Sequence, residues 1–151
     1  MKQRFLPLAL CIGTLFTQTT MAQTALDKGK DFLASNATQP DVKTTASGLQ
    51  YKILSEGKGK MPKATDSVLV NYRGTLLDGT EFDSSYKRNE PISFPLNGVI
   101  PGWTEGLQLV KEGGKIQLFI PSNLAYGARG AGGLIGPDET LIFEVELLKI
   151  L

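Results

Sequence analysis

Hydrophobic and polar residues alternate along much of the second half of the chain. Ile116, Leu118 and Ile120 fall on one face of a predicted strand. In segment 141–147 the alternate residues from Leu141 to Leu147 repeat the pattern, with Glu144 and Glu146 on the opposite face. A period of two is typical of a β-strand with one buried face. Further strands are predicted at residues 49–54 and 68–73, at 80–82 after the Asp78-Gly79 turn signal, and at 92–94.

Two segments carry helical patterns instead. Residues 25–36 predict an amphipathic helix, weakened by Gly29 because glycine disfavours helix interiors. Residues 101–110 predict a second helix, whose Trp103 and Leu107 would point into the concave side of the sheet. One short helix and five or six antiparallel strands predict an α+β fold, in which the sheet curls across residues 101–110 to bury both apolar faces.

Composition excludes several kinds of function. The chain has 151 residues, which favours one domain, and it has no histidine. Serine-histidine and cysteine-histidine catalytic pairs and histidine metal sites are therefore ruled out. The formal net charge is only +1, and we find no basic stripe of the kind that nucleic-acid-binding proteins carry. We expect no nucleic acid, no metal and no cofactor.

The N-terminal 22 residues have the pattern of a secretory signal peptide. Lys2 and Arg4 precede an apolar run over residues 5–16, and small residues follow up to Ala22. The run is too short to span a bilayer, so we expect no membrane span. Cys11, the one cysteine of the chain, is interpreted as part of the signal, which leaves no disulfide to support the exported fold.

Aromatic residues beside isolated polar groups are the remaining candidates for chemistry. From the pattern alone, such residues are more typical of an ordinary core than of a binding pocket. Asp83 follows Phe82 and is open to two interpretations: a solvated turn residue, or a buried carboxylate that needs a partner such as Arg88 or Tyr72. The glycine-rich segment 127–133 lacks the ending of a phosphate-binding loop; it either turns beside a ligand or simply turns.

A family resemblance favours the pocket. The segments VNYRG, DGTEFDSS, VIPGWTEG, LAYG and LIFEVELL occur in this order at residues 70–74, 78–85, 99–106, 124–127 and 141–148. From about residue 47 to residue 151 the chain resembles the FK506-binding-protein type of peptidyl-prolyl cis-trans isomerase. Residues 44–51 (TTASGLQY) further resemble the macrophage infectivity potentiator branch, exported proteins of Gram-negative bacteria. The resemblance implies a half-barrel sheet, a hydrophobic cleft and an isomerase that acts on X–Pro bonds in exported proteins, in the periplasm or outside the cell.

Site residues follow from the resemblance, position by position. Trp103 would form the floor of the cleft, the Ile100 N–H and the Tyr126 hydroxyl would bond to substrate carbonyls, and Asp83 would be held by Tyr72 and Arg88. Ile92 stands where the best-known members have an aromatic residue and Ala131 where some have histidine, which leaves substrate preference open. The implied catalytic residues are Tyr72, Phe82, Asp83, Ile100, Trp103, Tyr126 and Phe143, and the implied substrate-binding residues are Arg88, Ile92, Phe94, Val99, Leu134 and Ile135.

The predicted organisation is a signal peptide (1–22), a short helical lead and linker (23–46) and an isomerase domain (47–151). Its partners would be proline-containing, unfolded exported polypeptides, with macrolides such as FK506 or rapamycin as inhibitors. We expect a monomer, because helix 25–36 is short beside the dimerisation arm of the infectivity potentiator branch. Two other hypotheses stay open: a binding module with the same pocket but little turnover, and a structural or dimerisation role.

Overall fold

The computed structural model describes residues 23–151, so the predicted signal peptide, with Lys2, Arg4 and Cys11, lies outside the described residues. The first described element is helix α1 (Ala25–Asn36), which confirms the predicted helix. Its N-terminus is capped by Thr24, whose hydroxyl accepts a hydrogen bond from the Asp27 N–H at 3.2 Å. None of the helices in this part of the chain is long and apolar enough to cross a membrane.

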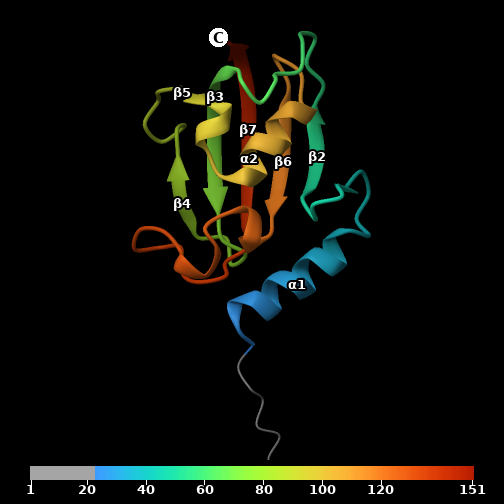
Figure 1. The fold of residues 1–151 in the computed structure, drawn as a ribbon, viewed down its shortest axis with the longest axis vertical. Helices are drawn as coiled ribbons and strands as arrows, with labels where there is room; N and C mark the ends of the chain where they lie inside the picture. The colour runs from blue at the N-terminus through green and yellow to red at the C-terminus, as the bar shows by residue number, and fades with distance from the viewer. Residues whose placement is uncertain (1–22) are drawn as a thin grey trace, which may run out of the picture.

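The predicted α+β fold is confirmed: within residues 23–151, seven antiparallel strands form one sheet around a short helix (Figure 1). The strand order is β1-β2-β6-β7-β3-β4, and β5 also pairs with β3. The strand absent from the prediction is β1, which has only two residues and therefore no readable alternation. The strands are β1 (Lys43–Thr44), β2 (Gln50–Ser55), β3 (Ser67–Thr75), β4 (Glu81–Ser84), β5 (Ile92–Pro95), β6 (Lys115–Ile120) and β7 (Leu141–Ile150).

The sheet curls because strand β3, which pairs with three other strands, is bent by irregular pairing. One edge of β3 pairs with β7, while its other edge is shared by β5 near one end and β4 near the other. The register of β3 shifts between Leu69 and Val70 against β7, and between Gly74 and Thr75 against β4. Such bulges bend a strand and increase its twist. The result is a concave face with room for a helix.

Helix α2 (Pro101–Gly106) lies across this concave face, in front of β6 and β7 (Figure 1). The predicted helix 101–110 is confirmed in its first part and then tightens into a 3-10 turn, η2 (Leu107–Leu109). Trp103 and Leu107 are buried against the sheet as predicted. Shorter 3-10 turns are η1 (Leu96–Gly98), η3 (Ser122–Leu124) and η4 (Gly127–Arg129).

The core fills the space between α2 and the concave face. The strand residues on that face follow the predicted alternation, and burial of each aliphatic side chain stabilises the fold by roughly 1.5–3 kcal/mol. The fully buried strand residues are Val68, Val70, Ile116, Leu118, Ile120, Leu141, Val145 and Leu147.

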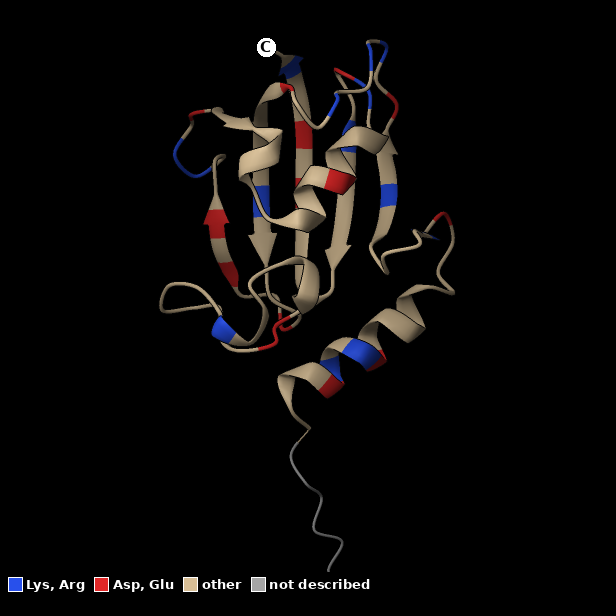
Figure 2. Cartoon of the chain, in the orientation of Figure 1, with Lys and Arg blue, Asp and Glu red and all other residues tan. Residues whose placement is uncertain are grey.

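The outer side of α2 is tied to the segment between β1 and β2. Glu105 is the single charged residue of α2 and stands out in red in Figure 2. Its carboxylate accepts a hydrogen bond from the Thr45 hydroxyl at 2.8 Å and further hydrogen bonds from the Ser47 hydroxyl. Hydrogen bonds to a charged acceptor are stronger than neutral ones. The segment between β1 and β2 therefore holds α2 from the side that faces away from the core.

Candidate active site

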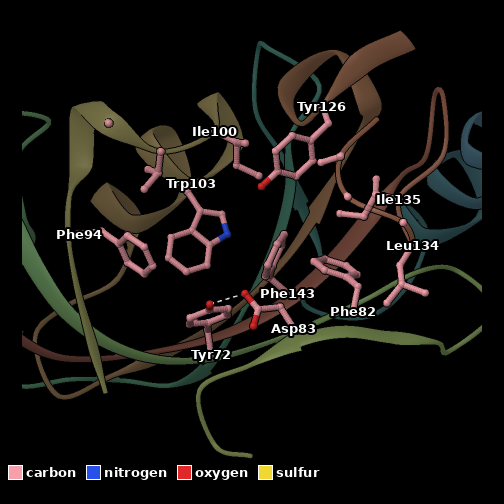
Figure 3. Close-up of a pocket in the computed structure, with 15 residues that line it drawn as sticks. Tyr72, Phe82, Asp83, Phe94, Ile100, Trp103, Tyr126, Leu134, Ile135 and Phe143 are labelled. Carbon is pink, nitrogen blue, oxygen red and sulfur yellow. Dashed lines mark hydrogen bonds between the residues drawn. The ribbon is translucent and has the colours of Figure 1, made fainter. Parts of the chain in front are cut away.

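A cavity of about 660 Å³ opens between α2, the β3–β4 edge of the sheet and the long β6–β7 connection (Figure 3). Its walls are largely aromatic and aliphatic, with two hydroxyl groups and one carboxylate among them. An apolar pocket with a few polar groups directed inward is the usual form of a small-ligand site. The lining residues are Tyr72, Phe82, Asp83, Phe94, Gly98, Val99, Ile100, Trp103, Tyr126, Ala131, Gly132, Gly133, Leu134, Ile135 and Phe143.

Trp103 is the centre of an aromatic cluster on one wall of the cavity. Its ring meets Tyr72, Phe94 and Phe143 at centroid distances of 5.2, 5.5 and 5.3 Å, each close to perpendicular. Edge-to-face pairs of this kind each add about 0.5–1.5 kcal/mol beyond the area they bury. The indole is therefore held rigidly at this wall. Its Nε1 is buried without a hydrogen-bonding acceptor in the described residues, and in Figure 3 its edge faces the Phe143 ring.

A polar network of three side chains borders the aromatic wall. The Tyr72 hydroxyl donates a hydrogen bond to Asp83 Oδ2. Arg88 Nη1 donates to Asp83 Oδ1 at 2.6 Å, and Arg88 Nη2 donates to the Tyr72 hydroxyl at 3.2 Å. Asp83 comes from β4, Tyr72 from β3 and Arg88 from the β4–β5 loop. The network fixes the edge of the cavity by joining these three elements.

The network shifts the pKa values of its members in opposite directions. Burial raises the pKa of Asp83, but hydrogen bonds from Arg88 and Tyr72 outweigh burial, so the net pKa lies below the usual value. Burial and the hydrogen bond to Asp83 raise the pKa of Tyr72. Both directions favour an ionised Asp83 that accepts a hydrogen bond from a neutral Tyr72.

We expect the Asp83 carboxyl to titrate below 3.8, the value of a free side chain, in carbonyl-carbon NMR of the native protein. Because the pKa is lowered by folding, the network stabilises the fold above the ordinary pKa, and this contribution is lost as the pH falls through the native pKa. Arg88→Ala removes the strongest lowering contact and should raise the Asp83 pKa. A wild-type carboxyl that titrates at or above the free value would contradict this assignment.

The opposite wall is the connection between β6 and β7, residues 121–140, which we term the pocket loop. Figure 3 shows the Tyr126 hydroxyl directed into the cavity. Ala131 and Ile135 exchange two backbone hydrogen bonds at 2.9 and 3.2 Å, which closes a tight turn around Gly132 and Gly133. The glycine-rich segment thus lies beside the cavity, as a turn beside a ligand would require.

The structure brings most of the predicted site residues to the cavity wall, but two lie elsewhere. Ile92 was expected in the pocket; at the start of β5 it pairs with Val70 and packs against the core. Arg88 was also expected there; its guanidinium is not part of the wall, but it holds Asp83 together with Tyr72, as the resemblance implied. Their expected part in substrate binding stays a prediction.

Four residues line the cavity without having been predicted as site residues: Gly98, Ala131, Gly132 and Gly133. Three of them belong to the glycine-rich segment, whose composition was the available signal. Small residues of this kind expose backbone at a pocket, and a sequence pattern carries no apolar signature for them. Among residues 23–151, no three His, Cys, Asp or Glu side chains gather closely enough to hold a metal ion.

Comparison with known proteins gives consistent matches across the chain. The family model described as FKBP-type peptidyl-prolyl cis-trans isomerase matches residues 58–148. A second model, the domain amino terminal to FKBP-type peptidyl-prolyl isomerase, matches residues 15–53. Two similar curated proteins are the probable FKBP-type peptidyl-prolyl cis-trans isomerase FkpA of Neisseria meningitidis, 59% identical over 82% of this chain and 46% of its own length, and the isomerase Mip of Coxiella burnetii, 51% identical over 82% and 54%.

Solved structures show the same likeness. The crystal structure of FkpA from Escherichia coli aligns with a TM-score of 0.79 and 56% identity, covering 82% of this chain and 57% of that one. A peptidyl-prolyl cis-trans isomerase from Pseudomonas syringae aligns with a TM-score of 0.78 and 44% identity, covering 83% and 92%. The chain spans about half the length of the curated relatives it matches.

Proposed function

Because this chain belongs to the family of FKBP-type peptidyl-prolyl cis-trans isomerases, we propose that it accelerates rotation about X–Pro bonds in polypeptides. The observation that carries the proposal is the aromatic cavity around Trp103 with the Tyr126 hydroxyl directed into it. Uncatalysed X–Pro rotation takes tens of seconds or more, slow enough to limit folding. An enzyme with this activity would assist the folding of its substrates.

The proposed mechanism needs neither a nucleophile nor a proton transfer. Amide resonance keeps the X–Pro bond planar, with a rotation barrier of about 18–20 kcal/mol. In the twisted state the resonance is lost, so the carbonyl oxygen carries less negative charge and depends less on water. A cavity lined by Phe82, Trp103 and Phe143 therefore disfavours the polar planar amide relative to the twisted one. Each 1.4 kcal/mol or so of this difference gives a tenfold rate increase.

Individual roles follow from the position of each group. The Trp103 face receives the proline ring, since its neighbours hold the indole fixed. The Tyr126 hydroxyl and the Ile100 N–H donate hydrogen bonds to substrate carbonyls on either side of the rotating bond. Asp83 keeps Tyr72 in place and presents the one carboxylate at the cavity edge. These roles orient the substrate and leave the bond free to rotate.

The proposal extends to the cellular setting. The substrates are proline-containing, unfolded exported proteins, met in the periplasm of a Gram-negative bacterium or outside the cell after removal of residues 1–22. Macrolides such as FK506 or rapamycin would occupy the same cavity and inhibit. A division into a helical lead (23–46) and an isomerase domain (47–151) and a monomeric state are further parts of this proposal.

A protease-coupled assay with proline-containing peptides tests the function. We expect the wild-type protein to accelerate isomerisation, and Tyr126→Phe to lower kcat/KM about two- to tenfold, because a neutral hydrogen bond contributes about 0.5–1.5 kcal/mol. Asp83→Val, with its fold checked by circular dichroism, should lower kcat/KM as well. A series of X–Pro peptides would define the preferred residue before proline. A wild-type protein that binds these peptides but leaves their isomerisation rate unchanged would instead be a binding module.

A further inference from the structure

Helix α1 packs on the sheet at the end where the pocket loop begins and ends. Figure 1 shows it lying across that end of the fold, next to the orange and red connection between β6 and β7. The Phe32 ring of α1 lies 6.0 Å from the ring of Phe119, the residue before the last of β6. Gly29 of α1 packs against Thr140, the residue just before β7. The helix therefore touches the last residue of the pocket loop and the end of β6 from which the loop starts.

These two contacts are buried. Phe119 is 6% exposed and Thr140 is 3% exposed. Phe119 alternates along β6 with the core residues Leu118 and Ile120, so its side chain points to the face opposite the core, where Phe32 meets it. At Gly29, an added Cβ would lie 3.3 Å from Thr140 Cβ and closer still to Thr140 Oγ1. The close approach of helix and loop end thus requires glycine, the residue that weakened the helical pattern.

The helix is held in this place by a second set of contacts at its C-terminal end. The Asn36 side-chain amide donates to Gln50 Oε1 at 2.9 Å in a buried position. Gln50 Nε2 donates in turn to the Leu33 carbonyl oxygen at 2.8 Å. Gln50 is the register partner of Phe119 across β2 and β6. Buried hydrogen bonds between amide groups fix the orientation of a helix, because a buried donor or acceptor left without its partner lowers the stability of the fold.

The pocket loop is tied together by its own hydrogen bonds. The Gly130 N–H donates to the Tyr126 carbonyl oxygen at 3.2 Å, and the Asp138 N–H donates to the Gly127 carbonyl oxygen at 2.9 Å. With the pair between Ala131 and Ile135, these bonds link the loop from its first third to its end. A loop with such internal bonds moves as a unit, so its orientation depends on its two ends.

We propose that Gly29 and Phe32 are positioning residues for the cavity: α1 braces the last residue of the pocket loop and the end of β6 that leads into it, and so sets where Tyr126 and Ile135 stand opposite Trp103. This inference rests on the proposed isomerase function for its kinetic consequence. Its structural part, the dependence of the pocket loop on α1, stands on the contacts alone.

The test compares full-chain variants at Gly29 and at its neighbour Lys30, which is exposed. Gly29→Ala adds a methyl group against Thr140, while Lys30→Ala leaves that contact untouched. We expect Gly29→Ala to lower kcat/KM about three- to tenfold, mainly by raising KM. This loss is smaller than the roughly hundredfold loss that a 1 Å misplacement of a catalytic group can cause. Amide hydrogen exchange should quicken in residues 121–140 but not in β4 or β5. Thr140→Ala, which removes Oγ1, should restore both readouts in the Gly29→Ala background.

Two outcomes would overturn the brace. One is exchange in residues 121–140 that Gly29→Ala changes no more than Lys30→Ala does. The other is an exchange change that Thr140→Ala fails to reverse, since it would then come from the helix and not from this contact. A wild-type protein without isomerase activity would refute the proposed function instead, and the exchange comparison would still decide the brace.

Discussion

Trp103→Ala is expected to reduce kcat/KM for proline peptides at least about a hundredfold. The indole lines the cavity and meets three further aromatic rings at centroid distances of 5.2–5.5 Å. Its removal would open the cavity wall to water, which stabilises the more polar planar amide more than the twisted one and so removes the difference that lowers the barrier. The same truncation should lower the free energy of unfolding by about 3–5 kcal/mol, as for other buried tryptophans.

Leu107→Ala is the matched control for this experiment. Leu107 follows the same helix, is fully buried and lies outside the cavity wall. Its truncation should cost a comparable 2–5 kcal/mol of stability, yet leave kcat/KM within about twofold when both variants are assayed at a temperature where they are folded. Thermal unfolding curves establish that temperature. Equal activity of the two folded variants would show that Trp103 acts through stability and not through the cavity.

The strands on the concave face could be predicted because their signal is local. In segments 116–120 and 141–147 the pleat points successive side chains to opposite faces of the sheet. Because one face is covered by the core, buried apolar residues recur at every second position of the sequence. Strand β1 has no such signal: Lys43 and Thr44 are exposed and belong to the sheet only through pairing with Tyr51 and Gln50. Pairing between segments is a tertiary property, which a single chain pattern does not contain.

The residues of the candidate site also differ in how far the sequence could predict them. Trp103, Phe82 and Tyr126 stand in long motifs, so a family resemblance transfers them as a group. Ile92 was transferred with them; it packs against the core, as Phe82 also does, but it is not among the residues that line the cavity. The residue type alone could not distinguish a core position from a pocket position, because isoleucine is suited to both. Gly29 marks the opposite case: it reads as a defect in a helix, and the reason for it is a contact with Thr140, 111 positions later in the chain.

Gly74→Ala is expected to disturb the cavity from within the sheet. Gly74 lies in β3 where the rings of Phe82 and Phe143 cross at 86° with centroids 5.4 Å apart. A Cβ at this position would lie 2.5 Å from Phe82 Cζ and 2.7 Å from Phe143 Cε1, so both rings must shift. Overpacking of this kind costs about 1–3 kcal/mol of stability. Because both rings form the cavity wall, we expect kcat/KM to fall at least about tenfold.

Gly136→Ala provides the control, since its Cβ would meet only Glu139, at an ordinary 3.7 Å. That variant should stay within about 0.5 kcal/mol of the wild type in urea unfolding. A second substitution makes the Gly74 argument sharper: Phe82→Leu removes the ring that the new methyl group strikes first. If crowding is the cause, Gly74→Ala combined with Phe82→Leu will be more stable than the sum of the two single changes predicts. Strict additivity would show instead that the methyl group acts on the β3 backbone, and the cavity rings would then not be the route by which activity is lost.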